Sequence, residues 1–241
     1  MAGPLTGRIA LVTGASAGIG RATALALAGA GADIVLTGRR RAELDAVAAQ
    51  CEKRGARARA APGDLTDNGF VRELAELAGD ADILINNAGI LTYAPLRDAT
   101  VEDAEAMFRA NVVAAFGVAR EIAVRMARRR QGHLVFVTSL SARNVNPLAV
   151  SYAATKHALS AYARGFRAEF KSSGLKVTEV APGMVDTAIR DASTHPDVVK
   201  SIASRKFSPL TVEDVADAIL YALGTRPGCC PDLIELRPTD N

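Results

Sequence analysis

Regular alternation between short apolar runs and segments of helical periodicity is the feature that most constrains the fold of this chain of 241 residues. Apolar runs of strand length occur at residues 8–13, 32–37, 57–61, 82–86, 133–138, 176–181 and 233–236. Segments with helical periodicity lie between them at residues 19–30, 40–54, 67–78, 100–129, 151–172 and 211–223. Strands that alternate with helices favour a parallel sheet, because each connection must cross one face to reach the start of the next strand.

We therefore expect an α/β fold in which one doubly wound, Rossmann-like parallel sheet carries helices on both faces. No Pro-, Gly- or Ser-rich linker and no internal repeat divides the sequence, which predicts a single domain over residues 1–241. No apolar run approaches the roughly 20 residues that span a bilayer. The N-terminal residues also lack the apolar core of a signal peptide. These features predict a soluble, cytoplasmic protein with no membrane partner.

Charge and cysteine content argue against several function classes. A formal net charge of +3 is too small to predict a nucleic-acid surface. Cys51, Cys229 and Cys230 have neither metal-ligand spacing nor the arrangement of a disulfide framework. We therefore expect reduced thiols, no metal site and no nucleic-acid partner.

A glycine-rich turn follows the first apolar run. Gly14, Gly18 and Gly20 separate this run from an alanine-rich helical segment, with the spacing G-x-x-x-G-x-G. Glycines tolerate positive φ in a tight turn and let a pyrophosphate approach the backbone, while free N–H groups at the start of the helix attract its charge. The turn is a candidate dinucleotide site. A turn that only packs strand against helix is an alternative at this point.

Arg39 and Arg40 follow the second apolar run, at the sheet edge where ligands bind in a doubly wound fold. NAD-binding folds usually place an Asp or Glu here for the ribose 2′-hydroxyl, but Asp33 lies at the opposite end of the run. A guanidinium suits a 2′-phosphate. Arginines that merely flank the next helix would oppose its dipole. The sequence therefore favours NADP(H).

Polar residues also follow the third and fourth runs. Asp64 could accept a hydrogen bond from an adenine amino group, or it could belong to the cap of the next helix, for which Thr66 and Asp67 are also candidates. Asn86 and Asn87 could bind a loop or a ligand, or could form a structural Asx-turn.

Asn111 lies among apolar residues in the long helical segment 100–129, where asparagine is a poor helix former. A buried amide needs hydrogen-bond partners. We therefore expect Asn111 to have a local hydrogen-bonding role or to mark an irregularity in the helix.

Ser139 follows the fifth apolar run, and Tyr152 and Lys156 lie on the next helical segment. A spacing of four residues places the tyrosine and the lysine on one face of a helix with adjacent side chains. The alternative is an amphipathic helix with a snorkelling lysine. The position directly after a strand-end serine favours a reactive site.

Residues 184–210 show weak periodicity, and so long an irregular stretch in a compact domain predicts a lid or binding loop. This segment and the loop 142–150 should shape the substrate pocket. Arg143 and Arg190 are candidates to bind a substrate carboxylate, although surface arginines are common in this arginine-rich chain.

Taken together, these residues resemble the short-chain dehydrogenase/reductase family. The motifs occur in the family's order and with its spacings: Thr13-Gly14-x-x-x-Gly18-x-Gly20, Asn86-Asn87-Ala88-Gly89, Asn111, Ser139, Tyr152-x-x-x-Lys156 and Pro182-Gly183. The resemblance covers essentially the whole chain, and the ordered set removes the packing-only interpretation of the glycine turn.

The resemblance implies catalytic roles for four residues. Tyr152 would be the acid in carbonyl reduction, and Lys156, with the oxidised nicotinamide, would lower its pKa while also holding the nicotinamide ribose. Ser139 would bind the substrate oxygen. Asn111 would hold a water that links Lys156 to solvent. Cofactor-binding roles are implied for Gly14, Ser16, Gly18, Ile19, Gly20, Arg39, Arg40, Asp64, Leu65, Asn87, Ala88, Gly89, Tyr152, Lys156, Pro182, Gly183, Val185 and Thr187.

Within the family, the turn with Arg39 and Arg40 resembles the NADP(H)-preferring branch, although Ala17 replaces a basic residue that some NADP(H)-dependent members carry. That turn and the closing Arg-Pro-Thr are most similar to 3-hydroxy-acid and small-aldehyde reductases. The implied function is hydride transfer between NADP(H) and a small carbonyl or secondary alcohol, in a homo-oligomer that is a tetramer or dimer. The alternatives are a non-catalytic NADP(H)-sensing protein, an epimerase or dehydratase of the same fold, and an NAD-dependent dehydrogenase.

Overall fold

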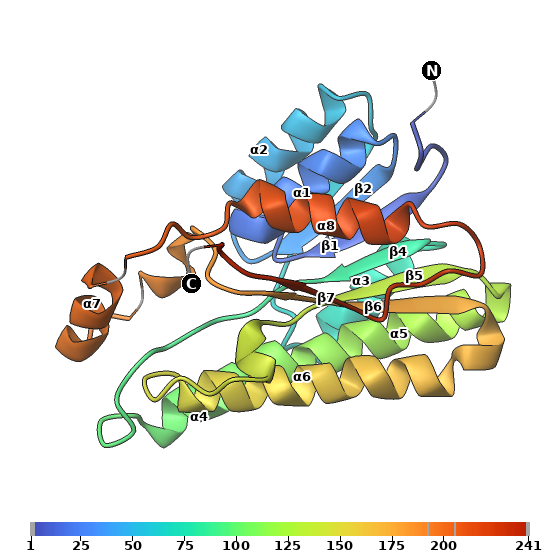
Figure 1. The fold of residues 1–241 in the computed structure, drawn as a ribbon. Helices are drawn as coiled ribbons and strands as arrows, with labels where there is room; N and C mark the ends of the chain where they lie inside the picture. The colour runs from blue at the N-terminus through green and yellow to red at the C-terminus, as the bar shows by residue number, and fades with distance from the viewer. Residues whose placement is uncertain (1–2, 192, 205, 240–241) are drawn as a thin grey trace.

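One parallel sheet organises the computed structural model, which describes residues 3–191, 193–204 and 206–239 (Figure 1). The strand order in this seven-stranded sheet of the described residues is β3-β2-β1-β4-β5-β6-β7. The strands are β1 (Ile9–Thr13), β2 (Asp33–Gly38), β3 (Ala58–Pro62), β4 (Ile83–Asn86), β5 (Gly132–Val137), β6 (Leu175–Pro182) and β7 (Leu233–Leu236). The order runs outward in both directions from β1 and β4, as in a doubly wound sheet. The predicted fold class is confirmed.

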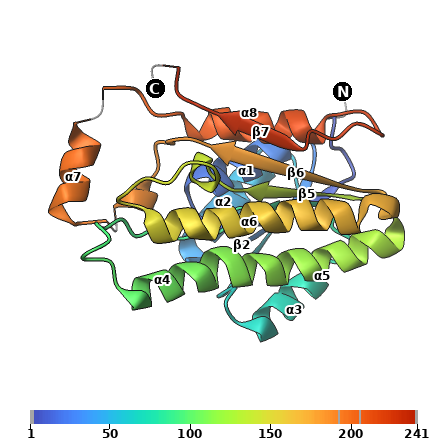
Figure 2. The same ribbon diagram turned by 60° about the horizontal axis from the view of Figure 1, so that its bottom comes forward.

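Helices cover both faces of this sheet. Figures 1 and 2 show α1, α2 and α8 on one face, and α3, α5 and α6 on the other. Alternate strand residues divide between the two layers, because a pleated strand buried on both sides points successive side chains to opposite faces. Val12 packs with the first layer and Leu11 with the second. The helices are α1 (Gly18–Gly29), α2 (Arg41–Glu52), α3 (Asn68–Ala78), α4 (Val101–Phe108), α5 (Ala114–Arg129), α6 (Val150–Glu169), α7 (Pro196–Ala203) and α8 (Val212–Leu223).

The register of the strands brings their C-terminal ends to one edge of the sheet. Thr13 at the end of β1 pairs with Thr37 of β2, and Val137 at the end of β5 pairs with Val180 of β6. All neighbouring strands are parallel, so the segments that follow them gather at this edge. The polar residues that the sequence places after each strand therefore lie around a common space.

The segment 100–129 is not one continuous α-helix. A π-helical turn, Arg109–Val113, separates α4 from α5, and buried Asn111 lies at its centre. The helix irregularity expected at Asn111 is confirmed. Such π-turns often occur at functional sites.

The segment 184–210 contains α7, which the weak periodicity did not indicate. Pro196 occupies the first turn of α7, and the His195 side chain accepts a hydrogen bond from the Asp197 backbone N–H. The expectation of irregular structure over the whole segment is therefore wrong for these residues. The proline and the acidic residue in the first turn are helix-start signals.

No helix in the described part of the chain is both long and apolar enough to cross a bilayer. The same residues contain no cluster of three or more His, Cys, Asp or Glu side chains that could hold a metal ion. Cys51, Cys229 and Cys230 are free thiols, and burial raises the pKa of Cys51 to about 11. Cys51 is therefore a core residue and not a reactive thiolate.

Candidate active site

A cleft of about 1030 Å³ follows the C-terminal edge of the sheet. It begins at the glycine turn after β1, passes the ends of β2, β4 and β5, and reaches the segment after β6. All the residues for which the sequence predicts a cofactor role line this cleft, with the exception of Gly20. Of the four predicted catalytic residues, Ser139, Tyr152 and Lys156 line it, whereas Asn111 does not.

The glycine turn has the geometry of an anion site. Gly14 and Gly18 have φ values of 65° and 54°, in the left-handed region that favours glycine. The helix α1 begins at Gly18, its N-cap residue Ala17 makes no side-chain capping bond, and its first turn contains no acidic residue. Its first N–H groups therefore remain available to a bound anion.

Gly20 serves packing and does not line the cleft. A Cβ atom at this position would lie 2.3 Å from the Gly14 carbonyl oxygen and 2.6 Å from the Asn87 side-chain nitrogen. The Asn87 amide donates to the Thr13 carbonyl at 3.0 Å, and the Thr13 hydroxyl accepts from the Asn87 backbone N–H at 2.9 Å. These bonds clamp the segment after β4 against the glycine turn. Asn87 therefore shapes this turn as well as lining the cleft.

The arginines after β2 lie at one end of the cleft. Arg40 donates to the Ser16 hydroxyl at 3.2 Å and pairs with Glu43 at 3.3 Å. Arg39 lines the cleft near Asp64. Asp33 lies at the start of β2, where it binds Arg57 with an Nε–Oδ2 distance of 2.8 Å. Arg39 and Arg40 themselves follow β2 directly.

Asp64 and Asp67 have different roles after β3. Asp67 caps α3 by accepting from the Gly69 backbone N–H at 2.7 Å. Asp64 accepts from both the backbone N–H and the hydroxyl of Thr66, each at 2.9 Å. These hydrogen bonds hold the pKa of Asp64 below its usual range, so the group is a carboxylate and can accept from a ligand at the cleft.

Tyr152 and Lys156 are neighbours on one face of α6, as their spacing predicts. The Lys156 ammonium lies 5.7 Å from the centre of the Tyr152 ring and donates to the Val137 carbonyl at 3.1 Å. Ser139, at the end of β5, accepts from the Ser141 backbone N–H at 3.1 Å. All three side chains are at least nine-tenths buried. The tertiary fold therefore brings the predicted acid, ammonium and serine together in a largely dry site.

Burial dominates the protonation of this pair. It raises the pKa of Tyr152 well above its usual range, and nearby Tyr93 adds to the effect, whereas a hydrogen bond with Ser139 and the charge of Arg190 act in the opposite direction. Burial lowers the pKa of Lys156 to about 8. The expected depression of the tyrosine pKa is therefore not produced by the side chains of this chain alone.

Asn111 acts as a bridge between three segments. Its amide oxygen accepts from the Ile90 backbone N–H at 2.7 Å, and its nitrogen donates to the Ile90 carbonyl at 2.9 Å and to the Thr155 hydroxyl at 3.2 Å. The Thr155 hydroxyl donates to the Tyr152 carbonyl at 2.7 Å. Asn111 therefore positions α6 and the segment after β4. The water-holding role stays a prediction.

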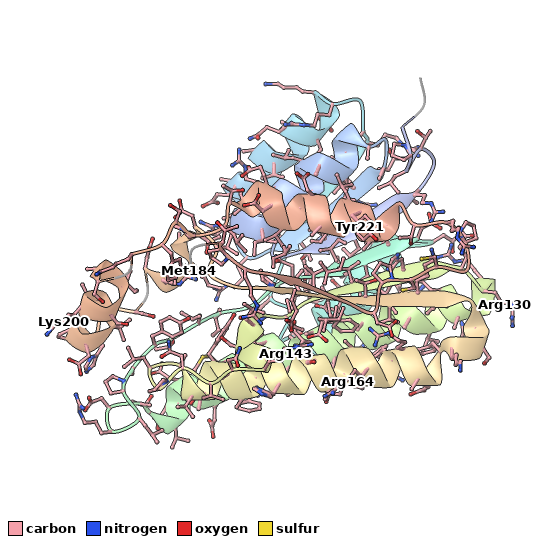
Figure 3. The ribbon with its side chains drawn as sticks, in the orientation of Figure 1. Arg130, Arg143, Arg164, Met184, Lys200 and Tyr221 are labelled. Atoms are coloured by element: carbon pink, nitrogen blue, oxygen red, sulfur yellow. The ribbon has the colours of Figure 1, made fainter. Side chains whose placement is uncertain are left out.

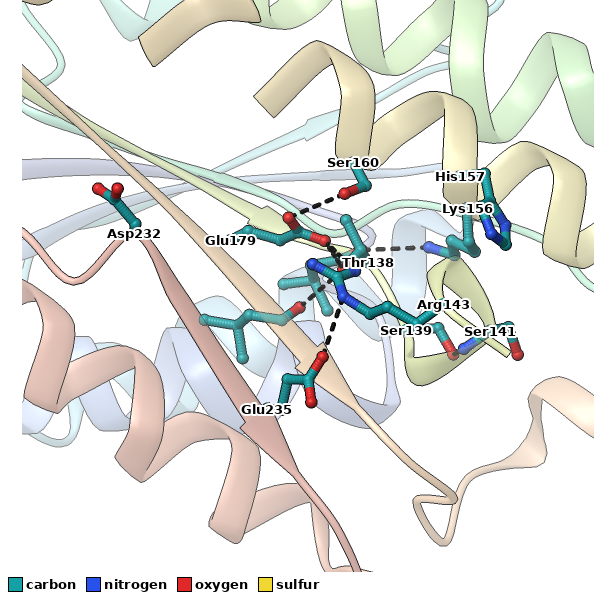
Figure 4. A network of polar contacts seen from close by, with 12 residues as sticks. Thr138, Ser139, Ser141, Arg143, Lys156, His157, Ser160, Glu179, Asp232 and Glu235 are labelled. Carbon is teal, nitrogen blue, oxygen red and sulfur yellow. Dashed lines mark hydrogen bonds and ion pairs between the residues drawn. The ribbon is translucent and has the colours of Figure 1, made fainter. Parts of the chain in front are cut away.

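Glu179 on β6 is a buried charged residue that the sequence analysis did not select. Its carboxylate accepts from Thr138 at 2.7 Å, from Arg143 at 2.7 Å and from Ser160 at 3.0 Å, as Figure 4 shows. Burial alone would raise its pKa, but these three hydrogen bonds hold it below the usual range. An acidic residue inside the apolar run 176–181 was the available signal, because buried charges need partners.

Arg143 is committed to this network. Besides Glu179, it pairs with Glu235 of β7 at 2.9 Å. Figure 3 shows Arg143 close to the sheet and α6. The hypothesis that Arg143 binds a substrate carboxylate is therefore wrong, because its guanidinium is already neutralised by two carboxylates.

The segment after β6 lies over the Tyr152 end of the cleft. An isolated parallel bridge joins Val185 to Leu210, so the beginning and the end of this segment lie side by side. Polar contacts hold its outer part: the Arg97–Asp197 ion pair has a distance of 2.8 Å, and His195 Nε2 lies 3.2 Å from the Asp98 carboxylate. Figure 3 shows Met184 where the segment begins and Lys200 on α7, away from the sheet.

Comparisons with known proteins agree with this geometry. A family model described as short chain dehydrogenase matches residues 8–197. An uncharacterized oxidoreductase of Staphylococcus aureus (strain USA300) is 36% identical over 227 residues, which cover 92% of this chain and 93% of the relative.

Two solved structures share the fold over nearly their full length. The closed form of a serine dehydrogenase complexed with NADP⁺ has a TM-score of 0.89 and 25% identity, covering 97% of this chain and 96% of that chain. A 7α-hydroxysteroid dehydrogenase complexed with NADH and 7-oxo glycochenodeoxycholic acid has a TM-score of 0.86 and 26% identity, covering 96% and 93%. One of these relatives holds NADP⁺ and the other NADH.

Proposed function

The chain belongs to the short-chain dehydrogenase/reductase family of oxidoreductases, and on this premise we propose that it transfers a hydride between NADP(H) and a small carbonyl or secondary alcohol. The substrate is a ketone, an aldehyde, or a 3-oxo or 3-hydroxy acid. The observation that carries the proposal is the meeting of Ser139, Tyr152 and Lys156 in the cleft that also contains the glycine turn.

The residues of the cleft fit an NADP(H) molecule. The uncapped start of α1 and the positive φ values of Gly14 and Gly18 suit a pyrophosphate. Arg39 and Arg40 lie where a 2′-phosphate would project from the adenosine ribose, and Asp64 lies beside them for the adenine amino group. These arginines support NADP(H) over NAD(H), because no carboxylate follows β2 to bind a free 2′-hydroxyl.

The reaction adds a hydride to the carbonyl carbon and a proton to the carbonyl oxygen. The reduced dinucleotide supplies the hydride. Tyr152 donates the proton, and its raised pKa keeps the hydroxyl protonated until transfer. The Ser139 hydroxyl binds the oxygen as negative charge develops on it. In the reverse direction the Tyr152 phenolate accepts the alcohol proton, and the Lys156 ammonium stabilises that phenolate.

We also propose that the protein works in the cytoplasm as a homo-oligomer, a tetramer or a dimer, with residues 184–210 as a substrate lid. Large apolar side chains remain exposed along the segment 100–129, including Val101 at the start of α4 (69% exposed) and Val113 in the π-turn (60%). A second copy packed on the segment 100–129 would cover them. Size-exclusion chromatography with light scattering measures the assembly directly.

The test of the proposed activity is a panel of carbonyls and alcohols, assayed with NADPH, NADH, NADP⁺ and NAD⁺ through the absorbance of the reduced nicotinamide. We expect turnover that consumes the cofactor in proportion to product and is faster with NADP(H). Quenching of NADPH fluorescence without oxidation across the panel would favour a sensor. Product formed without net consumption of cofactor would favour an epimerase or dehydratase.

A further inference from the structure

Arg190 belongs to the segment after β6. Its side chain lines the same cleft as Tyr152. Its carbonyl accepts a hydrogen bond from the Ser193 backbone N–H at 2.8 Å, and the Ser193 hydroxyl accepts one from the Tyr93 backbone N–H at 3.0 Å. The Tyr93 ring meets the Tyr152 ring edge-on, with centres 6.3 Å apart. This chain of contacts ties the backbone of Arg190 to the surroundings of the reactive tyrosine.

The guanidinium of Arg190 is oriented but only partly satisfied. Its Nη1 donates to the Val185 carbonyl at 2.7 Å, which fixes the plane of the group. Its Nε is buried and has no hydrogen-bond partner in the described structure. A buried donor without a partner is costly, so an acceptor brought to this guanidinium would lower that cost. The planar guanidinium of an arginine matches the two oxygens of a carboxylate.

The charges around the cleft leave this guanidinium without a counter-ion. Among the described residues that line the cleft, Asp64 is the one carboxylate, and it lies beside Arg39, where Thr66 already binds it. Arg143 is neutralised by Glu179 and Glu235, whereas no carboxylate of the described residues pairs with Arg190. An anion that enters this end of the cleft therefore meets an unpaired positive charge.

We propose that Arg190 forms a carboxylate-binding subsite, so that the carbonyl substrate is an oxo acid and the corresponding alcohol is a hydroxy acid. The inference rests on the proposed function and selects one substrate class within it. The carboxylate binds at the guanidinium of Arg190 and takes no part in the chemistry. Hydride still goes to the carbonyl carbon, the proton of Tyr152 to its oxygen, and the reduced dinucleotide is oxidised.

A phosphate of the dinucleotide is the other anion that could reach Arg190. Thr187, three residues earlier, lies near the glycine turn, where a Cβ atom on Gly18 would be 3.3 Å from its methyl group. We favour the substrate, because the backbone contacts of Arg190 lead to Tyr93 and Tyr152, although its Nη1 also donates to the carbonyl of Val185, a predicted cofactor residue. Cofactor affinity and substrate preference are therefore measured separately.

The experiment compares the full-length protein with Arg190→Met, and with Arg109→Met as a matched control. Arg109 also lines the cleft but is exposed and lies on the π-turn. Oxidation of 2-hydroxybutanoate, 3-hydroxybutanoate and 4-hydroxypentanoate by NADP⁺ is assayed beside that of their methyl esters. We expect the natural protein to prefer at least one acid over its ester. Arg190→Met should raise the KM for that acid roughly 10- to 100-fold, as expected for a lost charged hydrogen bond.

The same variant should leave the KM for the ester and the Kd for NADPH within about twofold of the natural protein, since neither would contact Arg190. Equal losses for acid and ester together with weaker NADPH binding would assign Arg190 to the cofactor and overturn the subsite. The same selective loss in Arg109→Met would assign the preference to the general charge of the cleft.

Further outcomes separate the subsite from the proposed function. Turnover of neutral alcohols without preference for any acid in the natural protein overturns the subsite and leaves the proposed function standing. Absence of turnover with every alcohol and carbonyl overturns both. If Arg190→Met does not fold, Arg190→Gln and Arg190→Lys are compared, and the acid-to-ester ratio should fall most for glutamine because the charge is lost.

Discussion

At the scale of single residues, Lys156 shows how a proposed catalytic role opposes stability. An ammonium in a site this dry is costly, because burial disfavours its charged form. Its one protein acceptor in the described structure is the Val137 carbonyl at 3.1 Å. The pKa of about 8 leaves the group mostly protonated at neutral pH, where its charge can stabilise the Tyr152 phenolate.

Tyr152→Phe tests the proton donor. The variant keeps the ring that packs against Tyr93 and removes only the hydroxyl. We expect folding and NADPH affinity to be preserved while turnover falls by orders of magnitude, since a positioned acid contributes roughly 10²- to 10⁴-fold. Steady-state kinetics and NADPH fluorescence titration measure the two properties. Retained turnover would remove Tyr152 from the acid role.

Lys156→Met tests how much the buried ammonium lowers the free energy of unfolding, and how this cost changes with pH. The folded chain has a pKa of about 8 here and the unfolded chain one near the model-peptide value of 10.5. Below pH 8 both states hold the proton, and the folded state bears the full cost of the buried charge. Between the two values the folded state releases the proton first, so the free energy of unfolding rises with pH.

Methionine removes this cost at every pH. We therefore expect the variant to be more stable than the natural protein by about 2 kcal/mol at pH 7, allowing for the lost hydrogen bond, and to lose this advantage above pH 9. It should have almost no turnover. Thermal melts of both proteins at pH 7 and pH 9.5 provide the comparison, in which other titrating groups cancel. An advantage that does not change with pH would contradict the prediction.

Arg39→Asp tests cofactor choice at a single position. A carboxylate after β2 would repel a 2′-phosphate and accept from a free 2′-hydroxyl, so the preference should pass from NADPH to NADH. The kcat/KM for NADPH should fall roughly 10- to 100-fold, as expected for a lost charged hydrogen bond. Arg41→Asp is the control, because Arg41 is exposed, pairs with Asp45 and does not line the cleft. An unchanged preference in Arg39→Asp would favour an NAD-dependent enzyme.

At the scale of secondary-structure elements, the candidate active site depends on hydrogen bonds between segments. Asn111 in the π-turn joins the segment after β4 to α6, and Glu179 joins β6 to the turn after β5 and to α6. Both residues are buried, and neither of them lines the cleft. The positions of Ser139 and Lys156 therefore depend on polar groups that touch no substrate.

The pair of Glu179 and Arg143 provides a test at this scale. Glu179→Gln leaves the guanidinium of Arg143 partly uncompensated and should lower the free energy of unfolding by roughly 3 kcal/mol. The double variant Glu179→Leu with Arg143→Met removes both charges and should recover much of that stability, since apolar side chains of similar size can replace a buried ion pair.

Turnover should not recover with stability. Without the carboxylate, Thr138 and Ser160 lose the acceptor that aligns Ser139 with α6. We therefore expect a lowered kcat with nearly unchanged Kd for NADPH in the double variant. Chemical denaturation, kinetics and fluorescence titration measure the three quantities. Full recovery of kcat together with stability would show that the pair supports the fold only.

At the scale of the whole molecule, the cleft is a product of topology. All seven strands of the described residues have lining residues at or just after their C-terminal ends because they run in the same direction, and the segment after β6 closes the Tyr152 end. A ligand that lies along the cleft would contact both halves of the sheet. Its binding should therefore stabilise the molecule as a unit.

NADPH should raise the melting temperature of the protein. A ligand that binds only the folded state at 100 times its Kd adds about 2.7 kcal/mol to the free energy of unfolding. For a domain of this size that corresponds to roughly 5–10 °C. At equal concentration NADH should give a smaller shift, and in Arg39→Asp the order should reverse. A thermal shift titration with each cofactor measures these changes in melting temperature. Identical shifts with NADPH and NADH in the natural protein would count against 2′-phosphate recognition.

The sequence by itself determined the fold class, the glycine turn and the helical face shared by Tyr152 and Lys156. These features depend on short-range order: strand and helix periodicity, glycine spacing and the four-residue repeat of a helix are written within a few neighbouring residues. It also located the irregularity at Asn111, because an amide among apolar residues needs partners. It missed α7, whose start signals lie in a stretch of weak periodicity.

The tertiary structure alone decided which partners the polar groups have. Glu179 meets a threonine 41 residues away, Arg143 is neutralised there, and Gly20 packs against Asn87 instead of lining the cleft. The raised pKa of Tyr152 has the same origin, since exclusion of water requires segments that are distant in the chain to surround the ring. Local patterns specify which elements form. Packing between distant segments specifies which charges and hydroxyls remain free to react.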